Sequence, residues 1–348
     1  MEKTFVIPSA LEENYREFEK VADDLLEGLK ITNFKDKDYI LGKLALKEGL
    51  APHKFLNSSA EDIDYQLIGL TALAIAGQGS FNNFIVTTGF PFTTYQSYRA
   101  GASDFFKGHH SLNIDTRPLG GTSVDTINFN VQEINVMTEI EGAVKFIRDG
   151  ELKDNNNFLI AGIGYGTFEL ALSRTSGLLY RTTVSSTGII YAMRLLEEEL
   201  QKHYYYNILT DQQLEIAFQR GSIIVNRRPI DLIETRNKVL ETYYNEVISP
   251  IIRRSIKDED FYGIERFYIV GGGALYPKLI ELFKQEFQDV IEIVLVPSPN
   301  FASSRGYCFK SIETAKEKIR FLDNKKSYLC VGLDLGNNNT VITINDEF

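Results

Sequence analysis

Three turns rich in glycine or asparagine are the segments of this sequence whose residue types are best suited to chemistry. Each follows an apolar run that we predict to be a strand, and the turns span residues 334–340, 162–167 and 271–274. Glycine and asparagine adopt the backbone conformations in which several N–H groups point at one position. Such turns can therefore bind a phosphate group without a dedicated basic pocket.

The residues around these turns add further capabilities. Asp334 stands at the end of its strand, where a carboxylate can hold Mg²⁺ directly or through water. Two hairpin turns that face each other can hold a polyphosphate from both sides. The run Gly271-Gly272-Gly273 has no Cβ atom to obstruct a flat nucleoside, and the helix expected after it can meet a phosphate with its N-terminus.

Each turn has a simpler interpretation when it is taken singly. The first is typical of a plain hairpin turn, the second of a bend or bulge, and the third of tight packing before a helix. A weak internal repeat favours the joint interpretation, because residues 329–336 can be laid on 157–164 and each copy leaves its turn through another strand. Two copies of one hairpin indicate a duplicated domain. In this alignment Gly162 stands opposite Asp334.

The elements that must position these turns alternate along the chain, which indicates an α/β architecture. We predict strands at 4–7, 84–91, 127–136, 158–163, 168–172, 267–270, 291–296, 329–333 and 341–344. We predict helices at 12–30, 60–78, 141–149, 187–202, 234–254 and 276–288. The polar run 153–157 is the best internal boundary, and 316–327 is a charged stretch.

Length and composition bound the class of protein. A chain of 348 residues suggests about two domains. A net charge of −10 argues against a broad non-specific nucleic-acid surface. No run approaches the length of a membrane span and no signal peptide is recognisable, so we expect a cytoplasmic protein without membrane contact. The two cysteines, Cys308 and Cys330, lack zinc-ligand spacing and fit a reduced setting.

The three turns together resemble the two phosphate loops and the adenosine loop of the actin/Hsp70/sugar-kinase ATPase superfamily. Segments 7–10, 86–91 and 300–307 are similar to the "fPS", "vtGLP" and "qfANarGy" segments of the actin-like ParM group, which segregates plasmids. The resemblance implies an actin-like ATPase fold, with two RNase-H-like domains around a nucleotide cleft. Domain I would comprise 1–152 plus 305–348, and domain II would comprise 153–304.

The order of the motifs differs from that of the family. There the first phosphate hairpin opens the chain, whereas here it closes it. The sequence therefore resembles a circular permutant, cut between the second and third strands of domain I, in which 316–327 includes the connection between the old termini. We expect Glu2 and Glu347 to lie on neighbouring, hydrogen-bonded strands.

The resemblance also implies roles for individual residues. Asp334 matches the aspartate near Mg²⁺ and counts as both a metal ligand and a catalytic residue. Glu139 matches the residue that orients the attacking water; Glu141 is the fallback, and an exposed charge at a helix start is the alternative for Glu139. The expected nucleotide-binding residues are Asp334, Gly336, Asn337, Asn338, Asn339, Thr340, Gly164, Tyr165, Gly166, Thr167, Gly188, Gly271, Gly272, Gly273, Ala274 and Tyr276.

By this resemblance the protein binds ATP or GTP with Mg²⁺, polymerises head-to-tail and hydrolyses the nucleotide. Its role would be plasmid segregation through a DNA-binding adaptor, or another bacterial cytoskeletal task, without direct nucleic-acid contact. One departure matters: the second phosphate loop has Gly162 where the family has aspartate, and we do not expect Glu169 to occupy that place. A non-hydrolysing scaffold is therefore one alternative, and a small-molecule kinase of the same superfamily is another.

Overall fold

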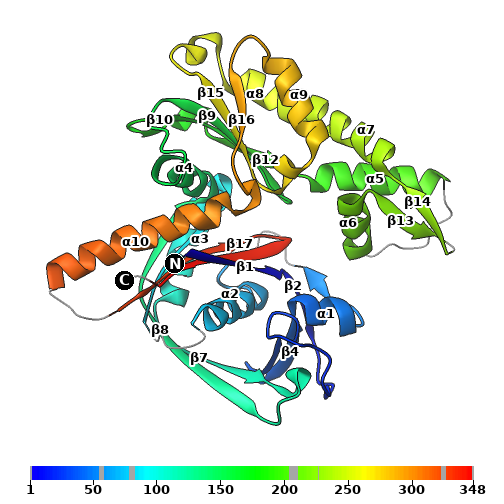
Figure 1. The fold of residues 1–348 in the computed structure, drawn as a ribbon, viewed down its shortest axis with the longest axis vertical. Coiled ribbons are helices and arrows are strands. Elements are labelled where there is room, and N and C mark those ends of the chain that lie inside the picture. The colour runs from blue at the N-terminus through cyan, green and yellow to red at the C-terminus, as the bar shows by residue number, and fades with distance from the viewer. Residues whose placement is uncertain are drawn as a thin grey trace. The chain divides into compact units, whose positions relative to one another are not determined.

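The computed structural model describes residues 2–54, 59–77, 83–203, 211–225, 227–322 and 327–346. The chain divides into two compact units (Figure 1). Unit 1 comprises Met1–Asp154 and Phe301–Phe348, and unit 2 comprises Asn155–Asn300.

Unit 1 is built on a ten-stranded sheet. Its strands are β1 (Glu2–Pro8), β2 (Ala10–Glu13), β3 (Lys30–Phe34), β4 (Lys37–Leu41), β5 (His53–Lys54), β6 (Asn83–Phe90), β7 (Gly108–Asp115), β8 (Val124–Thr138), β17 (Leu329–Leu335) and β18 (Asn339–Asn345). The strand order is β1-β18-β17-β6-β8-β7-β3-β4-β2-β5. Near one edge, β1 pairs antiparallel with β18, and Glu2 lies opposite Asn345. Glu347 lies outside the described residues.

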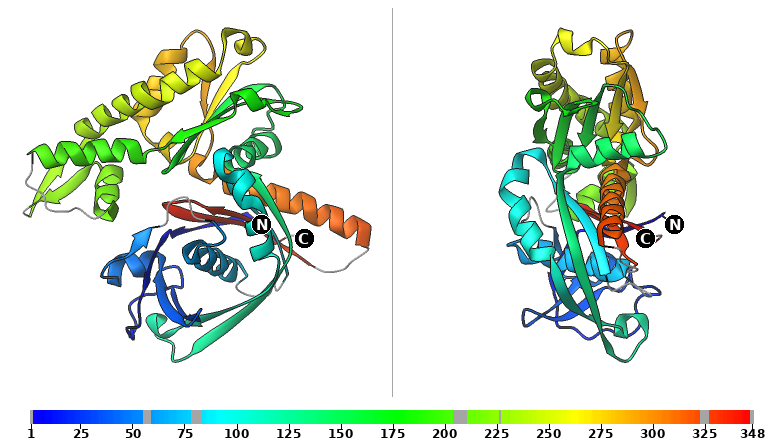
Figure 2. Two further views of the ribbon diagram at one scale, coloured as in Figure 1. Left: turned by 180° about the vertical axis from the view of Figure 1, so that it is seen from behind. Right: turned by 90° about the vertical axis from the view of Figure 1, so that its left-hand side faces the viewer.

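Period-two alternation in β17 decides which residues face which helices. The helices of unit 1 are α1 (Gly42–Glu48), α2 (Ile63–Ala76), α3 (Phe92–Phe106), α4 (Glu139–Asp149) and α10 (Ala302–Leu322). Leu329, Val331 and Leu333 belong to the same buried cluster as α2. Cys330 packs with Ala315 of α10, which runs beside β17 (Figure 2). Asp334 is in phase with Cys330, so it lies on the α10 face of the sheet.

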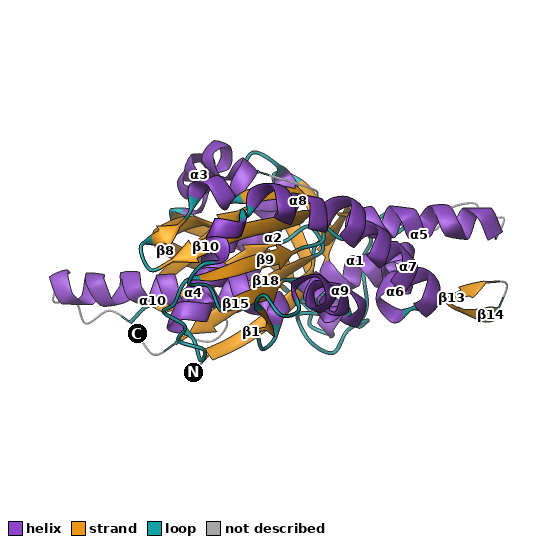
Figure 3. Ribbon diagram, turned by 90° about the horizontal axis from the view of Figure 1, so that it is seen from above, coloured by secondary structure: helices purple, strands orange, loops and turns teal. Residues whose placement is uncertain are grey.

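Unit 2 carries a smaller mixed sheet. Its strands are β9 (Phe158–Ile163), β10 (Thr167–Arg174), β11 (Gly177–Leu178), β12 (Val184–Thr187), β15 (Arg266–Val270) and β16 (Glu292–Leu295). The order is β11-β10-β9-β15-β16, with β12 also paired to β10. Its helices are α5 (Ile190–His203), α6 (Asp211–Arg220), α7 (Ile233–Tyr243), α8 (Ser249–Ser255) and α9 (Pro277–Phe287). A separate hairpin, β13 (Ser222–Val225) and β14 (Arg228–Asp231), follows α6 (Figure 3).

Two expectations about elements are wrong. The predicted helix at 12–30 is absent. Residues 12 and 13 belong to β2, which is paired on both sides by β4 and β5, and the Glu12 carboxylate accepts the Ala51 N–H at 2.6 Å. Residues 14–29 form neither helix nor strand. The long-range pairing of β2 overrides local helix propensity. The charged stretch at 316–322 is the end of α10, a helix that we did not predict. The other predicted strands and helices are present within a few residues, and α7 and α8 are joined by a π-helical turn.

A buried ion pair in unit 1 makes a pH-dependent contribution to stability. The Lys30 Nζ lies 3.2 Å from the Asp115 carboxylate, and the two side chains are 1% and 0% exposed. Arg117 also donates hydrogen bonds to this carboxylate, from its backbone N–H at 3.0 Å, from Nε at 2.9 and 3.1 Å and from Nη2 at 2.8 Å. Burial raises the pKa of Asp115, but the hydrogen bonds from Arg117 and Lys30 outweigh burial and lower the pKa overall.

We therefore expect Asp115→Asn to cost about 3 kcal/mol at pH 7, because it leaves Lys30 buried without its counter-ion. A lowered carboxyl pKa stabilises the fold above the pKa of the unfolded chain, and that contribution is lost as the pH falls through the folded pKa. The difference between wild type and variant should thus shrink in acid. Urea unfolding at pH 7 and at pH 3 measures it, with the exposed Asp104→Asn as control. A pH-independent difference would contradict this assignment.

Candidate functional site

The turn between β17 and β18 is supported on one side by Ser9. The Ser9 N–H donates to the carbonyl of Asn338 at 2.9 Å, and the Ser9 hydroxyl donates to the carbonyl of Gly336 at 2.6 Å. The same hydroxyl lies 3.0 Å from the buried Thr340 Oγ1. Lys54 donates a hydrogen bond to the side-chain oxygen of Asn338. Segment 7–10, which joins β1 to β2, thus fixes the first turn.

The turn between β9 and β10 is supported by the residues that lead into α5. Three consecutive N–H groups, of residues 188–190, donate to the three carbonyls of residues 164–166 over 2.9 to 3.0 Å. A Cβ on Gly188 would lie 2.5 Å from the Gly164 carbonyl oxygen and 2.6 Å from the Thr167 nitrogen. Only glycine permits this approach, so Gly188 shapes the turn through its backbone.

Both turns therefore have carbonyl groups bound from one side. In a planar trans peptide, the N–H of each residue points opposite to the carbonyl of the residue before it. The N–H groups of Asn337 and Asn339 point away from Ser9, and those of residues 165–167 point away from the start of α5. A phosphate-binding turn needs this orientation.

The three glycines of the third turn have different surroundings. A Cβ on Gly271 would lie 2.5 Å from the Ile163 carbonyl oxygen, and one on Gly273 would lie 2.3 Å from Ile163 Cγ2. Gly271 also has a φ of +86°. Gly272 is exposed, and nothing in the described chain lies within 4 Å of a Cβ placed there. Packing on β9 explains Gly271 and Gly273, whereas Gly272 is the position open to a ligand.

Tyr276, which directly precedes α9, is a packing residue in unit 2. Its ring meets Phe218 edge-on with centroids 5.3 Å apart, and the Arg236 guanidinium carbon lies 5.5 Å from its centroid. Burial raises the pKa of Tyr276 to about 12, so its hydroxyl stays neutral at physiological pH. The same unit brings residues 164–167, Gly188 and the third turn together around Ile163.

Asp334 is the acidic residue of the first turn. It pairs with Val341 across the hairpin, and desolvation raises the pKa of Asp334 to about 7. A nearby cation favours the charged form of such a carboxylate. Among the described residues no three His, Cys, Asp or Glu side chains cluster as a metal cage. Mg²⁺ is commonly bound by one or two carboxylates with phosphates and water, so Asp334 fits that ion when a phosphate is present.

The two glutamates that we predict to orient water, Glu139 and Glu141, both lie at the start of α4 but differ in their contacts. Thr138 and Glu141 form a capping box, in which the Glu141 carboxylate accepts the Thr138 N–H at 3.0 Å. Glu141 is therefore a helix cap rather than a fallback for catalysis. Glu139 occupies the first turn of α4, and its carbonyl accepts the Ser303 hydroxyl at 3.3 Å. Its catalytic role stays a prediction.

The register of β9 and β10 changes the interpretation of Gly162. Glu169 lies directly opposite Gly162 in this antiparallel ladder. Counting residues along one strand does not reveal which residue faces it on the next, so the pairing of Glu169 with Gly162 could not be read from the sequence.

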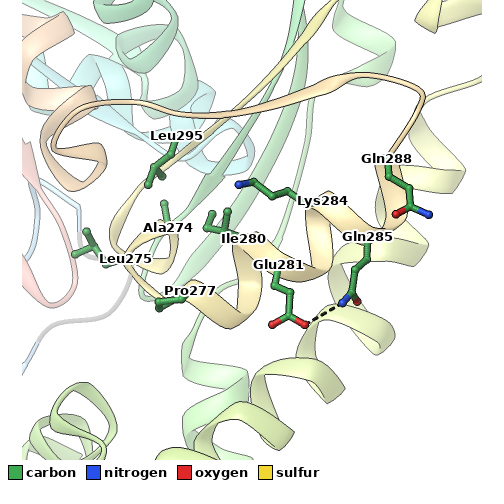
Figure 4. Close-up of a pocket in the computed structure, with 9 residues that line it drawn as sticks. All are labelled: Ala274, Leu275, Pro277, Ile280, Glu281, Lys284, Gln285, Gln288 and Leu295. Carbon is green, nitrogen blue, oxygen red and sulfur yellow. Dashed lines mark hydrogen bonds between the residues drawn. The ribbon is translucent and has the colours of Figure 1, made fainter.

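A separate groove of about 750 Å³ runs between α9 and β16 in unit 2 (Figure 4). It shares Ala274 with the third turn. Its lining combines apolar and polar side chains, namely Ala274, Leu275, Pro277, Ile280, Leu295, Glu281, Lys284, Gln285 and Gln288. Gln285 donates to the Glu281 carboxylate at 2.9 Å along its polar side.

Comparison with known proteins identifies the fold. No protein-family model and no curated protein matches the sequence. Solved structures do match. The archaeal actin homologue Ta0583 superposes with a TM-score of 0.70 at 15% identity, over 89% of this chain and 92% of that one. A 15-stranded ParM filament from Clostridium botulinum gives a TM-score of 0.72 at 16% identity, over 88% and 92%. This chain has an actin-like fold.

Two features of these actin-like relatives bear on the site. Ta0583 has also been solved in complex with ADP, and that structure matches with a TM-score of 0.67 at 15% identity over 89% of this chain and 92% of that one. The Clostridium ParM is described as a filament.

For the present chain, no helix in the described part is both long and apolar enough to cross a membrane.

Sequence reasoning missed several supporting residues of the candidate site. In the sequence, Ser9 stood out only as part of segment 7–10, which is similar to a family motif. Its hydrogen bonds to the first turn depend on strand pairing between β1 and β18. Glu169 required the β9–β10 register. The available signal was a single charged residue in an apolar run, because Glu169 stands between Phe168 and Leu170 and both are buried.

Proposed function

We propose that this actin-like protein binds ATP or GTP with Mg²⁺ at its glycine turns and hydrolyses the nucleotide. The observation that carries the proposal is the shared construction of the two hairpin turns, whose carbonyls are bound from one side so that their N–H groups point to the other. Asp334 would hold the Mg²⁺ and Glu139 would orient water. The metal would supply charge stabilisation at the phosphates.

We also propose that the protein assembles head-to-tail into filaments; the ParM relative is described as a 15-stranded filament. A heterologous contact that does not close on itself generates an open filament. Its cellular role would be the movement of plasmid DNA through an adaptor, or another bacterial cytoskeletal task.

Assembly should depend on nucleotide. In sedimentation, we expect the protein to pellet with ATP and Mg²⁺ and to stay in the supernatant with EDTA, because bound nucleotide stabilises the state that binds it and that state is the one we propose to assemble. A protein that remains monomeric across concentration and salt, while still binding nucleotide, would contradict filament formation and leave nucleotide binding in place.

Gly162 favours a second candidate, a nucleotide-binding scaffold without turnover. The aspartate that the resemblance leads us to expect is absent there. Phosphate release measured on assembled protein separates the candidates: an ATPase releases phosphate after assembly, whereas a scaffold keeps its nucleotide intact.

We further propose that the chain is circularly permuted relative to its actin-like relatives. The hairpin β17–β18 comes last in sequence, yet it lies between β1 and β6 in the sheet. A rearranged chain that starts at Ser327, joins Phe348 to Met1 and ends at Leu322 should therefore fold alike. We expect the same circular dichroism spectrum and a melting temperature within a few degrees. Failure to fold with both a short and a long joining linker would contradict the permutation.

A further inference from the structure

We infer that Glu169 supplies, from β10, the carboxylate that Gly162 lacks on β9, and that it positions the water shell of the divalent cation at the second turn. This inference rests on the proposed nucleotide-binding function. Glu169 is a positioning residue in this scheme, because it acts through water.

The register and the sheet face support this assignment. Glu169 pairs with Gly162, and residues opposite each other in an antiparallel ladder project from the same face. The neighbours Phe168 and Leu170 belong to the buried core of unit 2, as do Ala161 and Ile163. Glu169 and a side chain at position 162 would therefore share the face turned away from that core.

The absence of a side chain at Gly162 and the length of the Glu169 side chain also support this assignment. Gly162 itself contributes no side chain to this face, where Val270 of β15 is its neighbour on the other side. Cβ atoms of directly opposed residues lie about 5 Å apart, and glutamate is one methylene longer than aspartate. Its carboxylate can thus cover the place that an aspartate at 162 would reach from the opposite side.

The surroundings of Glu169 hold it in place. Its side chain is 3% exposed, and the Ser185 hydroxyl donates to Oε1 at 2.9 Å. Thr167, two residues nearer the turn, lies on the same face. Carboxylate and hydroxyl oxygens accept hydrogen bonds from the water molecules that Mg²⁺ retains. A buried carboxylate costs free energy, and a cation close to it offsets that cost.

The test measures how Mg²⁺ changes nucleotide affinity rather than turnover alone. A fluorescent ATP analogue is titrated with Mg²⁺ and with EDTA against wild type, Glu169→Gln, Gly162→Asp and the Gly162→Asp/Glu169→Gln double variant. Glutamine keeps an oxygen for Ser185 but has no charge. We expect Glu169→Gln to reduce the Mg²⁺-dependent gain in affinity about tenfold or more, as loss of an outer-shell ligand does. The double variant should restore the gain.

A matched control separates the cation effect from loss of stability. Glu286 is another partnered carboxylate of unit 2, accepting bonds from Tyr244, Ser249 and Arg253. Glu286→Gln should lower the melting temperature and leave the Mg²⁺ dependence unchanged.

The outcomes distinguish failure of the Glu169 assignment from failure of the proposed nucleotide binding. If wild type binds nucleotide with a Mg²⁺ dependence that Glu169→Gln leaves intact, the inference is overturned and the proposed function stands. A rise in phosphate release of orders of magnitude for Gly162→Asp alone would also overturn it, because Glu169 would then not fill the role. If wild type binds no nucleotide at all, the proposed function fails first and the inference fails with it.

Discussion

Asp334→Asn is expected to lower Mg²⁺-dependent hydrolysis about a hundredfold or more. The change removes the carboxylate that we propose for the metal while it keeps the size and shape of the side chain. Phosphate release at saturating ATP measures the effect, and the exposed Asp125→Asn serves as control. Equal phosphate release by wild type and Asp334→Asn would remove Asp334 from the metal site.

Without nucleotide, we do not expect Asp334→Asn to destabilise the fold. Measuring stability therefore distinguishes the expected loss of hydrolysis from unfolding of the variant. The folded pKa of Asp334 is raised by burial from 3.8 to about 7. Its contribution to stability is complete below the lower value and is lost as the pH rises through the higher one. Asp334→Asn, which cannot ionise, should therefore be at least as stable as wild type at pH 8, and the difference should fade by pH 4. Thermal melts without nucleotide at both pH values test this.

Gly306→Ala is expected to cost about 3 kcal/mol of folding free energy. A Cβ on Gly306 would lie 1.7 Å from the Gly142 carbonyl oxygen, so α10 and α4 meet backbone to backbone. A Cβ on Gly142 would in turn lie 2.4 Å from Tyr307 Cε1. Alanine at 306 must push the helices apart, and overpacking of this kind costs about 1–3 kcal/mol or more.

Gly101→Ala provides the contrasting case. Gly101 lies within α3, and a Cβ there would meet only the Ala60 Cβ, at 3.9 Å. Because alanine favours helix without a clash, we expect a gain of about 1 kcal/mol. Urea midpoints of both variants measure the difference. A Gly306→Ala variant as stable as Gly101→Ala would show that α4 and α10 can separate freely.

Local chemistry determined much of what the sequence revealed about this actin-like chain. Glycine and asparagine turns are recognisable because few other residues adopt those backbone conformations. Alternating apolar residues identified β8, and an almost wholly apolar run identified α2 as a buried helix. These patterns depend only on neighbours in sequence, so the α/β class could be inferred without coordinates.

Tertiary structure decided what depends on neighbours distant in sequence. The start of the expected helix at 12–30 is instead paired in β2, and α10 shows no strong apolar stripe because glycine and serine face its partners. Only packing separates Gly271 and Gly273, which contact β9, from the open Gly272. Only register places Glu169 opposite Gly162. Sequence thus specifies the turns, whereas strand register and close helix packing determine which side chains lie beside them.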